Sequence, residues 1–360
     1  MVIEFLKQRL SQFTAYHPTK RMTYEDGLML LSLLRGYQMT NDVELWDGLL
    51  RYVDSHIDSQ GRIKSYQQAE YNIDNILAGI VLFDVYSLTQ QQKYLKAIQS
   101  LHQQLLTHPR TDSGSFWHKL RYPNQIWLDG LYMGQVFYYK QGLALQDKKI
   151  FDDIKKQIAN VSTYLWNDYT HLYHHAYDET KRMQWANPFT GKSPNIWSRS
   201  VGWYAMALVD LYELAQHHDA PFASDLSILL TELLEGMLPY QDPTSHMWYQ
   251  VVDFPKYKGN YLETSGSAML AYSMIKGANL GMLDSKYQTY GKNTIDGIDK
   301  TYLTQDEQGI YYLDGICSVA GLDNELRDGS ITYYLSEKIA VNEIKGVGPY
   351  IFAKLELMKQ

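Results

Sequence analysis

Two aspartates stand in similar apolar surroundings along the chain. Asp129 lies in "QIWLDGLYMG" (125–134), between a bulky apolar pair and a Gly followed by another aromatic residue, and Asp74 follows Tyr71 in "YNIDNI". An apolar environment raises the pKa of a carboxyl group and can keep it protonated near neutral pH, as a general acid requires. Two acids in one cleft can divide their roles when their environments differ. We therefore predict that Asp129 and Asp74 carry the chemistry.

An arginine among tryptophans is the second feature suited to chemistry. The stretch "NIWSRSVGWYAMAL" (195–208) places Arg199 between Trp197 and Trp203, at the start of an expected helix. The guanidinium is a planar, permanently charged fork that can bind a carboxylate through two hydrogen bonds. This favours an anionic ligand, although an ordinary ion pair with an acidic neighbour is the alternative.

Three histidines, His171, His174 and His175, are close enough in sequence to suggest a metal site. No cysteine accompanies them, and the expected strand would point neighbouring side chains to opposite faces. We therefore expect no metal and no cofactor, and assign His175 to the wall of a pocket or to acid–base work.

Composition excludes several classes of function. The net charge is −7 and the basic residues are dispersed, which argues against a nucleic-acid surface. No apolar stretch is long enough to span a membrane, and the N-terminus does not read as a signal peptide. With Cys317 as the single cysteine, no intrachain disulfide can form. We expect a cytoplasmic protein with no obligate protein partner.

The aromatic content is the unusual part of the composition. The 31 Tyr and 8 Trp suit a cleft that stacks on sugar faces and binds hydroxyls.

Helical periodicity runs through most of the chain and takes two forms that alternate. Six segments have one apolar face, and six others are apolar nearly all round and rich in small residues, as helices buried between neighbours must be. The amphipathic segments are 1–13, 42–57, 91–106, 148–166, 222–238 and 287–303. The buried segments are 24–37, 71–86, 126–139, 197–214, 262–278 and 346–358. Such repetition predicts an all-α fold, an (α/α)₆ barrel of six inner and six outer helices forming one domain over residues 1–360. An open helical solenoid is the rival fold.

Polar residues begin most of the buried segments. If the inner helices run parallel, their N-terminal ends converge on one face, where the positive ends of the helix dipoles favour an anionic ligand. For Asp26, helix capping is the preferred explanation. Long connections at 167–197, 240–262 and 303–345 are expected to cover that face, the first of them as a hairpin.

The chain resembles a known family at four motifs. These are "NIDNI" (72–76), "QIWLDGLYM" (125–133), "NIWSRSVGWYAMAL" (195–208) and "RDGSITYYLSE" with "KGVGPYIFA" (327–353). Together, and in this order, they resemble the unsaturated rhamnogalacturonyl hydrolases of glycoside hydrolase family 105.

The resemblance implies an (α/α)₆-barrel enzyme that removes the terminal 4,5-unsaturated uronic acid from oligosaccharides left by pectin lyases. It gives Asp129 the role of catalytic acid and base, and Asp74 that of its partner. Protonation at C4 and hydration of the double bond would need no metal or organic cofactor. The pocket residues that it implies are Tyr24, Trp127, His175, Trp197, Arg199 and Trp203.

Three other functions are compatible with the sequence. The nearest is an unsaturated glucuronyl hydrolase of the related family 88, which acts on glycosaminoglycan fragments by the same chemistry. An inverting glycosidase or a sugar epimerase on the same fold is the second, although the buried segments lack the paired histidines expected of an epimerase. A non-catalytic carbohydrate-binding scaffold would explain the aromatic residues but not two acids at the starts of inner helices.

Overall fold

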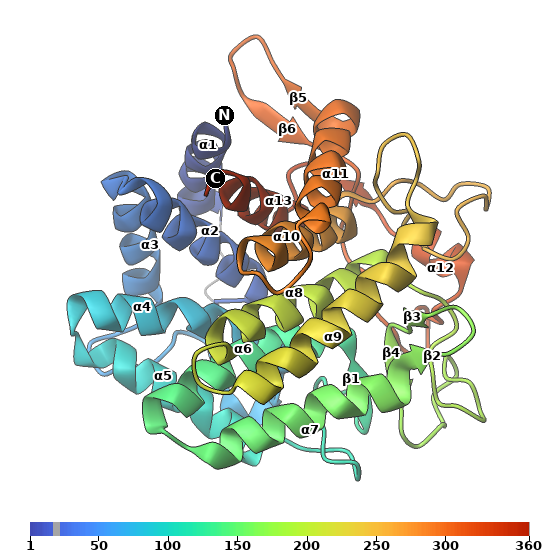
Figure 1. The fold of residues 1–360 in the computed structure, drawn as a ribbon. Helices are drawn as coiled ribbons and strands as arrows, with labels where there is room; N and C mark the ends of the chain where they lie inside the picture. The colour runs from blue at the N-terminus through green and yellow to red at the C-terminus, as the bar shows by residue number, and fades with distance from the viewer. Residues whose placement is uncertain (17–21, 360) are drawn as a thin grey trace.

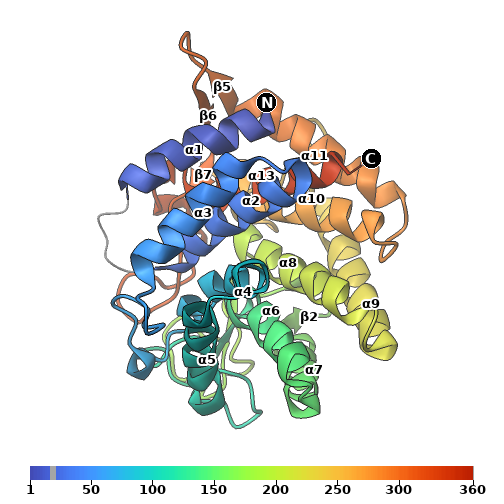
Figure 2. The same ribbon diagram turned by 90° about the vertical axis from the view of Figure 1, so that its left-hand side faces the viewer.

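The computed structural model describes residues 1–16 and 22–359, and within them the helices form two concentric layers (Figure 1). Figure 2 looks along the barrel and shows the inner helices ringed by the outer ones. The inner helices are α2 (Tyr24–Thr40), α4 (Ile80–Thr89), α6 (Leu128–Leu145), α8 (Ser198–Ala215), α10 (Thr264–Asn279) and α13 (Ile344–Leu357). The outer helices are α1 (Val2–Tyr16), α3 (Val43–His56), α5 (Gln92–Thr107), α7 (Lys148–Leu165), α9 (Ala220–Met237) and α11 (Lys286–Tyr302). Each inner helix packs against the next, and α13 returns to α2, so the ring is closed. The predicted (α/α)₆ barrel is confirmed, and the open solenoid is wrong.

Small residues let the inner helices approach one another closely. A Cβ on Gly27 of α2 would lie 2.9 Å from the Cα of Ala78, and one on Gly266 of α10 would lie 2.7 Å from the carbonyl carbon of Ser198. Contacts this short leave no room for a side chain, which explains why segments buried on all sides are rich in Gly, Ala and Ser. One continuous hydrophobic cluster includes buried residues from every part of the barrel, from the first helix to the last.

The second inner segment differs from its prediction. Residues 71–86 were expected to form one helix, but the chain makes two 3₁₀ turns, η2 (Ile73–Asn75) and η3 (Leu77–Gly79), before α4 begins at Ile80. The side chain of Asn72 accepts a hydrogen bond from the Asp74 backbone N–H and holds the first turn. Tight turns of this kind are common at helix N-termini. Asp74 therefore sits on a short turn rather than in an α-helix.

Short strands and loops gather at the N-terminal ends of the inner helices, most of them on the right-hand side of Figure 1, with the β5–β6 hairpin (303–313) at the top. We call this end the mouth. Its strand pairs are β1 (Gln125–Trp127) with β4 (Ala176–Asp178), β2 (Trp166–Asn167) with β3 (Leu172–Tyr173), β5 (Leu303–Gln305) with β6 (Tyr311–Leu313), and β7 (Ile316–Cys317) with β8 (Ile339–Ala340). The segment 303–345 also contains α12 (Ile331–Ser336). Two further 3₁₀ turns are η1 (Gln68–Glu70) and η4 (Leu238–Tyr240). The hairpin expected within 167–197 is thus only partly formed by that segment, because β3 pairs back to β2 while β4 pairs with β1.

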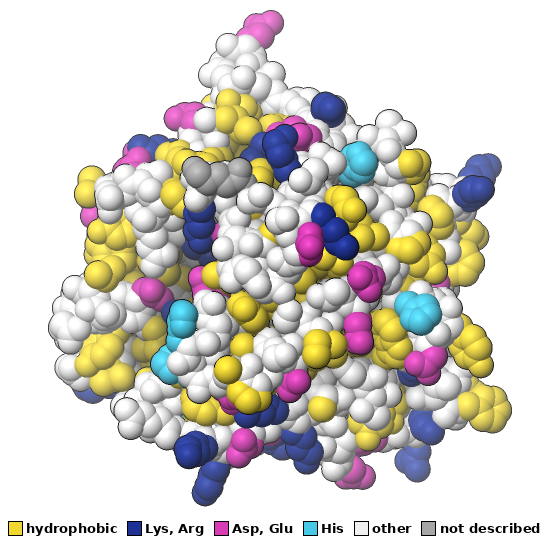
Figure 3. Space-filling view, viewed as in Figure 1, with side chains coloured by type: hydrophobic (Ala, Val, Ile, Leu, Met, Phe, Trp, Pro, Cys, Tyr) yellow, Lys and Arg dark blue, Asp and Glu magenta, His cyan; other side chains and the backbone are white. Residues whose placement is uncertain are grey.

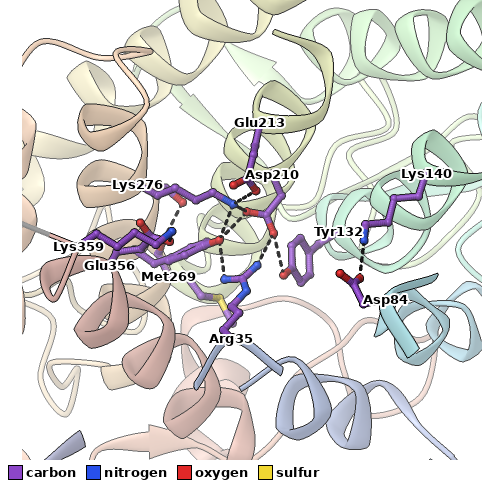
Figure 4. Close-up of polar contacts among 12 residues, drawn as sticks. Arg35, Asp84, Tyr132, Lys140, Asp210, Glu213, Met269, Lys276, Glu356 and Lys359 are labelled. Atoms are coloured by element: carbon purple, nitrogen blue, oxygen red, sulfur yellow. Dashed lines mark hydrogen bonds and ion pairs between the residues drawn. The ribbon is translucent and has the colours of Figure 1, made fainter. Parts of the chain in front are cut away.

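A buried charge cluster lies toward the other end of the inner helices (Figure 4). Asp210 of α8 accepts hydrogen bonds from Arg35 Nη2 at 2.9 Å, Tyr132 Oη at 3.2 Å, Tyr272 Oη at 2.6 Å and Lys276 Nζ at 2.7 Å. Burial alone would raise the pKa of Asp210, but the charges of Lys276 and Arg35 outweigh it and hold that pKa well below its usual range. The cluster joins α2, α6, α8 and α10.

None of the helices in the described part of the chain is both long and apolar enough to cross a lipid bilayer.

Candidate active site

Asp129 is positioned by a strand that leads directly into a helix. β1 pairs with β4, which brings Trp127 opposite Ala176, and the Leu128 N–H donates to the His175 carbonyl at 3.1 Å. The next residue, Asp129, begins the first turn of α6, where the helix dipole favours a carboxylate. Its Oδ2 lies 3.3 Å from His175 Nε2. The carboxylate is 14% exposed, whereas the histidine is completely buried. The sequence assigned both residues to the same end of the barrel, and the structure places them side by side.

The other nitrogen of His175 is also held. Its Nδ1 lies 2.8 Å from the hydroxyl of Tyr334, which is on α12. The imidazole ring lies 4.8 Å from the ring of Trp197, and Trp197 stacks on Tyr334 at 6.0 Å. The Tyr334 hydroxyl therefore holds one ring nitrogen of His175 while the other faces Asp129.

Asp74 occupies a different electrostatic environment. Its Oδ2 lies 2.5 Å from Lys119 Nζ, and its Oδ1 lies 3.7 Å from His118 Nε2. Asp74 is 13% exposed, nearly the same as Asp129. Tyr24 is close by: burial, followed by the negative charges of Glu25 and Asp74, raises the pKa of its hydroxyl well above the usual value. Asp74 is therefore an ion-paired carboxylate beside a neutral phenol.

His118 connects the surroundings of the two acids. Its ring is buried and stacks on Trp127, with centroids 4.5 Å apart and planes 9° apart. Burial, and then the charge of Lys119, lower the pKa of His118 well below its usual value, and the opposing effect of Asp129 does not restore it. A Cβ on Gly130 would lie 3.3 Å from His118 Nδ1, so the Gly after Asp129 gives this ring its space. His118 is therefore neutral at neutral pH.

Arg199 is buried and has partners within the protein. Its Nε donates to Ser265 Oγ at 2.6 Å, its Nη2 donates to the Cys317 carbonyl, and Glu263 Oε1 lies 3.6 Å from Nη2. This is the ion pair that the sequence left open as an alternative. None of the recorded hydrogen bonds of Arg199 within residues 1–16 and 22–359 uses Nη1, so that nitrogen is the part of the fork that a ligand could engage.

The remaining aromatic residues form a buried layer beneath the acids. Trp203 stacks on Tyr132 at 5.4 Å and meets the edge of Tyr24 at 6.3 Å. Trp127 is sandwiched between His118 and Tyr122, and its Nε1 donates to Gln125. The structure thus brings all eight predicted site residues to the mouth, with Asp129, Asp74 and Tyr24 more accessible than the layer below.

The other two histidines face elsewhere. His171 lies against the edge of Trp166, and the Nε2 of His174 lies 3.1 Å from the Asn167 amide nitrogen. Nor do three or more His, Cys, Asp or Glu side chains form a group able to hold a metal ion anywhere in the part of the chain that the structure describes. Asp26 acts as the expected cap, because its Oδ2 accepts from both the N–H and the hydroxyl of Thr23.

Sequence reasoning missed three side chains of this site: His118, Lys119 and Tyr334. His118 and Lys119 adjoin each other in "FWHKLRY", between aromatic residues and just before the segment that carries Asp129, which is a signal that could have been used. Tyr334 lies in the motif "RDGSITYYLSE" but is 159 positions from His175, and no local pattern predicts their contact.

An acid pair walled by aromatic rings, at the end where the inner helices begin, is an arrangement suited to cleaving sugars, and with the fold it defines a helical-barrel glycosidase. The family model of Glycosyl Hydrolase Family 88 matches residues 2–360. The chain therefore belongs to that family. Its sequence and structure are also similar to those of glycoside hydrolase family 105. A family 105 structure from C. acetobutylicum ATCC 824 is 39% identical, with a TM-score of 0.94 and 99% of each chain covered.

Two further comparisons are more distant. The unsaturated rhamnogalacturonyl hydrolase YesR of Bacillus subtilis (strain 168) is 24% identical over 268 residues, which is 72% of this chain and 71% of YesR. The unsaturated glucuronyl hydrolase of Bacillus sp. GL1, described as responsible for glycosaminoglycan degradation, is 14% identical with a TM-score of 0.72. That alignment covers 100% of this chain and 96% of the Bacillus sp. GL1 chain, and it supports the fold.

Proposed function

We propose that this protein removes the terminal 4,5-unsaturated uronic acid from oligosaccharides, with rhamnogalacturonan fragments as its substrates. One observation carries the proposal: the Asp129 carboxylate, at the barrel mouth, faces an imidazole that Tyr334 fixes from behind. This gives one acid an oriented partner on one side and access to a ligand on the other. Family membership supports the same type of reaction.

The proposed reaction begins at the double bond rather than at the glycosidic bond. Protonated Asp129 donates its proton to C4, and the positive charge that develops is shared between C5 and the ring oxygen. A water molecule attacks C5, and the Asp129 carboxylate takes the proton from that water. The resulting hemiketal opens to a ketone at C5 and leaves a hemiacetal at C1, which releases the remaining sugar. His175 orients the Asp129 carboxyl group throughout.

We propose that Asp74 orients sugar hydroxyls. Two roles were open for this residue, and the alternative was like-charge coupling that keeps the proton on Asp129. Lys119, 2.5 Å from Asp74, compensates its charge and weakens such coupling. In the same proposal, Arg199 Nη1 binds the uronate carboxylate, while the aromatic layer, Tyr24, Trp127, Trp197 and Trp203, forms the floor of the sugar pocket.

The likeness to YesR supports the choice of rhamnogalacturonan fragments. Glycosaminoglycan fragments are the second candidate, favoured by the shared fold with the Bacillus sp. GL1 enzyme. Parallel assays with an unsaturated disaccharide from rhamnogalacturonan and one from chondroitin separate them. Higher kcat/KM on the first supports the proposal, and higher kcat/KM on the second replaces the substrate without changing the reaction.

Asp129→Asn tests the reaction itself. The amide cannot supply or take the proton, so turnover should fall by about 10³-fold or more, followed through loss of the ultraviolet absorbance of the conjugated double bond. Asp74→Asn is the comparison, and it should raise KM more than it lowers kcat. Circular dichroism should show both variants folded. A near wild-type rate for Asp129→Asn would refute the assignment.

A further inference from the structure

A cavity lies beside the mouth, next to the short connection between β3 and β4 that carries His174 and His175. Its volume is about 420 Å³, within the range of roughly 300–1,000 Å³ typical of small-molecule sites. The β2–β3 hairpin and the segment 185–194 enclose it. His174 lines this cavity, whereas the adjacent His175 contacts Asp129. These two residues form the connection between β3 and β4, so one short segment contributes a side chain to each of the two sites.

Two aromatic side chains at this cavity are unusually exposed to solvent. Tyr169 is 96% exposed and Phe189 is 83% exposed, the highest values among the aromatic residues of the described chain. Tyr169 lines the cavity, and Phe189 lies on the loop between two lining residues, Asn187 and Thr190. Trp185 lines it as well and packs with Trp127 in one buried cluster. Exposed rings held at a polar cavity are suited to stacking on the apolar face of a sugar.

Hydrogen-bond donors at the cavity are already oriented and not fully used. The Oδ1 of Asn187 accepts from the Phe189 and Thr190 N–H groups, both at 2.9 Å, which fixes the amide, and the Nδ2 has no recorded partner in the described chain. The indole Nε1 of Trp185 is buried and likewise lacks a hydrogen-bond partner among the described residues. A buried donor without a partner costs free energy that a ligand hydroxyl would recover.

The lining has little net charge. One cation, Lys192, and one carboxylate, Asp168, line the cavity, and Lys192 Nζ donates to the Trp166 carbonyl. Burial, and then the charge of Lys192, lower the pKa of His174 to about 4, so it is neutral at neutral pH. Such a lining favours a neutral ligand over a uronate, in contrast to the mouth with its arginine and lysine.

From the exposed rings, the free donors and the neutral lining, we propose that this cavity is a second carbohydrate-binding site that takes a neutral sugar unit. This proposal does not depend on the reaction proposed for Asp129. The site would hold a neutral sugar of an oligosaccharide beside the mouth, on a surface that the catalytic residues do not share.

The test uses methyl α-L-rhamnopyranoside and methyl β-D-galactopyranoside as neutral probes, with the methyl glycoside of galacturonic acid, whose carboxylate is free, as the charged counterpart. Saturation-transfer NMR should show contact between the wild-type protein and at least one neutral probe. The double variant Tyr169→Ala/Phe189→Ala, which changes only exposed rings, should bind that probe roughly tenfold more weakly, as expected for losing about 1 kcal/mol of stacking or more. Its turnover of an unsaturated disaccharide should stay within about twofold of wild type.

Tyr290→Ala is the matched control, because Tyr290 is an exposed ring on the outer helix α11 and should leave probe binding unchanged. Three results would overturn the proposal: no transfer to any neutral probe, equal binding by the wild type and the double variant, or binding of the galacturonate alone. Analytical sedimentation tests whether the exposed rings instead form an interface between protein molecules. If the double variant instead abolishes a self-association of the wild-type protein, the exposed rings serve a protein interface and the proposal is wrong.

Discussion

Two aspartates on neighbouring inner helices, Asp210 and Asp129, lie in contrasting surroundings. Asp210 lies toward the end of the barrel opposite the mouth, which we call the closed end. It accepts four hydrogen bonds, two of them from the cationic side chains of Arg35 and Lys276. At the mouth, Asp129 is nearly as enclosed, yet no hydrogen bond to its Oδ2 is made within the described residues, and its nearest polar neighbour is His175 at 3.3 Å. Both carboxylates lie on inner helices that run side by side.

The difference separates structural from functional acids. A carboxylate whose lone pairs are all used by fixed donors is locked in its charged form and cannot exchange a proton with a substrate. A carboxylate with unused hydrogen-bonding capacity at an accessible surface can. We therefore propose that Asp210 belongs to the framework and that Asp129 is the group available for chemistry, although both are aspartates on inner helices. Three experiments test this contrast between a structural and a functional acid.

The largest effect is expected at the closed end. Asp210→Asn leaves Arg35 and Lys276 without their shared carboxylate, which should lower the free energy of unfolding by about 3–5 kcal/mol in a urea titration. Asp84→Asn is the control, since Asp84 forms a partly exposed ion pair with Lys140 at 2.8 Å (Figure 4) and should cost about 1 kcal/mol or less. Equal losses for the two variants would contradict a framework role for Asp210.

At the mouth, a change should affect turnover more than stability. His175→Asn can keep the contact with Tyr334 but loses the one with Asp129, so kcat should fall by about 10²-fold, or roughly 3 kcal/mol, with KM changing less. His171→Asn, at an exposed position in the same segment, should have wild-type kinetics. If His175→Asn kept the wild-type pH profile and rate, the histidine would only pack against its neighbours.

Acid should destabilise the fold through a buried histidine near the mouth. Burial lowers the pKa of His108 to about 4, and its ring lies beside Tyr71, near the Asp74 turn. Between pH 6.5 and 4 the unfolded chain binds a proton here that the folded chain does not, so this stability is present above pH 6.5 and is lost as the pH falls. By pH 4.5 the loss should reach about 2 kcal/mol.

Urea titrations at pH 7 and pH 4.5 measure this loss, and His108→Gln should reduce it. His217→Gln, an exposed position just after α8 at the closed end, should leave it unchanged. An identical pH dependence in all three proteins would show that His108 does not carry the effect. Asp210 adds little in this window because its carboxyl stays mostly ionised there in both the folded and the unfolded chain: Lys276 and Arg35 lower its pKa in the folded state, and the ordinary pKa of an aspartate, about 3.9, also lies below pH 4.5.

The sequence was sufficient for the architecture because the two kinds of helix differ in composition. Helices with one apolar face and helices buried on all sides can be told apart by periodicity alone, and their alternation specifies the barrel. The start of the second inner helix was placed wrongly because 3₁₀ turns share the spacing of apolar residues with a helix. Side-chain capping by Asn72, which begins those turns, has no periodic signal.

The site could be predicted where chemistry depends on residues within one motif. Asp129, Trp127 and Arg199 were proposed in this way, and the structure places all three at the mouth; the sequence also left open the ion pair of Arg199. What could not be predicted are contacts between distant segments, such as Lys119 with Asp74 across 45 positions and Tyr334 with His175 across 159. These contacts depend on how the mouth segments pack, which local patterns do not encode.

The contact between Tyr334 and His175 also bears on the order in which the molecule is built. Both acids belong to the first part of the chain to be synthesised, but Tyr334 and the helix that closes the ring, α13, come at its end. Until then, the faces of α2 and α10 that α13 covers are exposed and prone to association. Neither ring closure nor the contact between Tyr334 and His175 can form before the last part of the chain is made, and a chain that stops short of α12 has both acids but no Tyr334 beside His175.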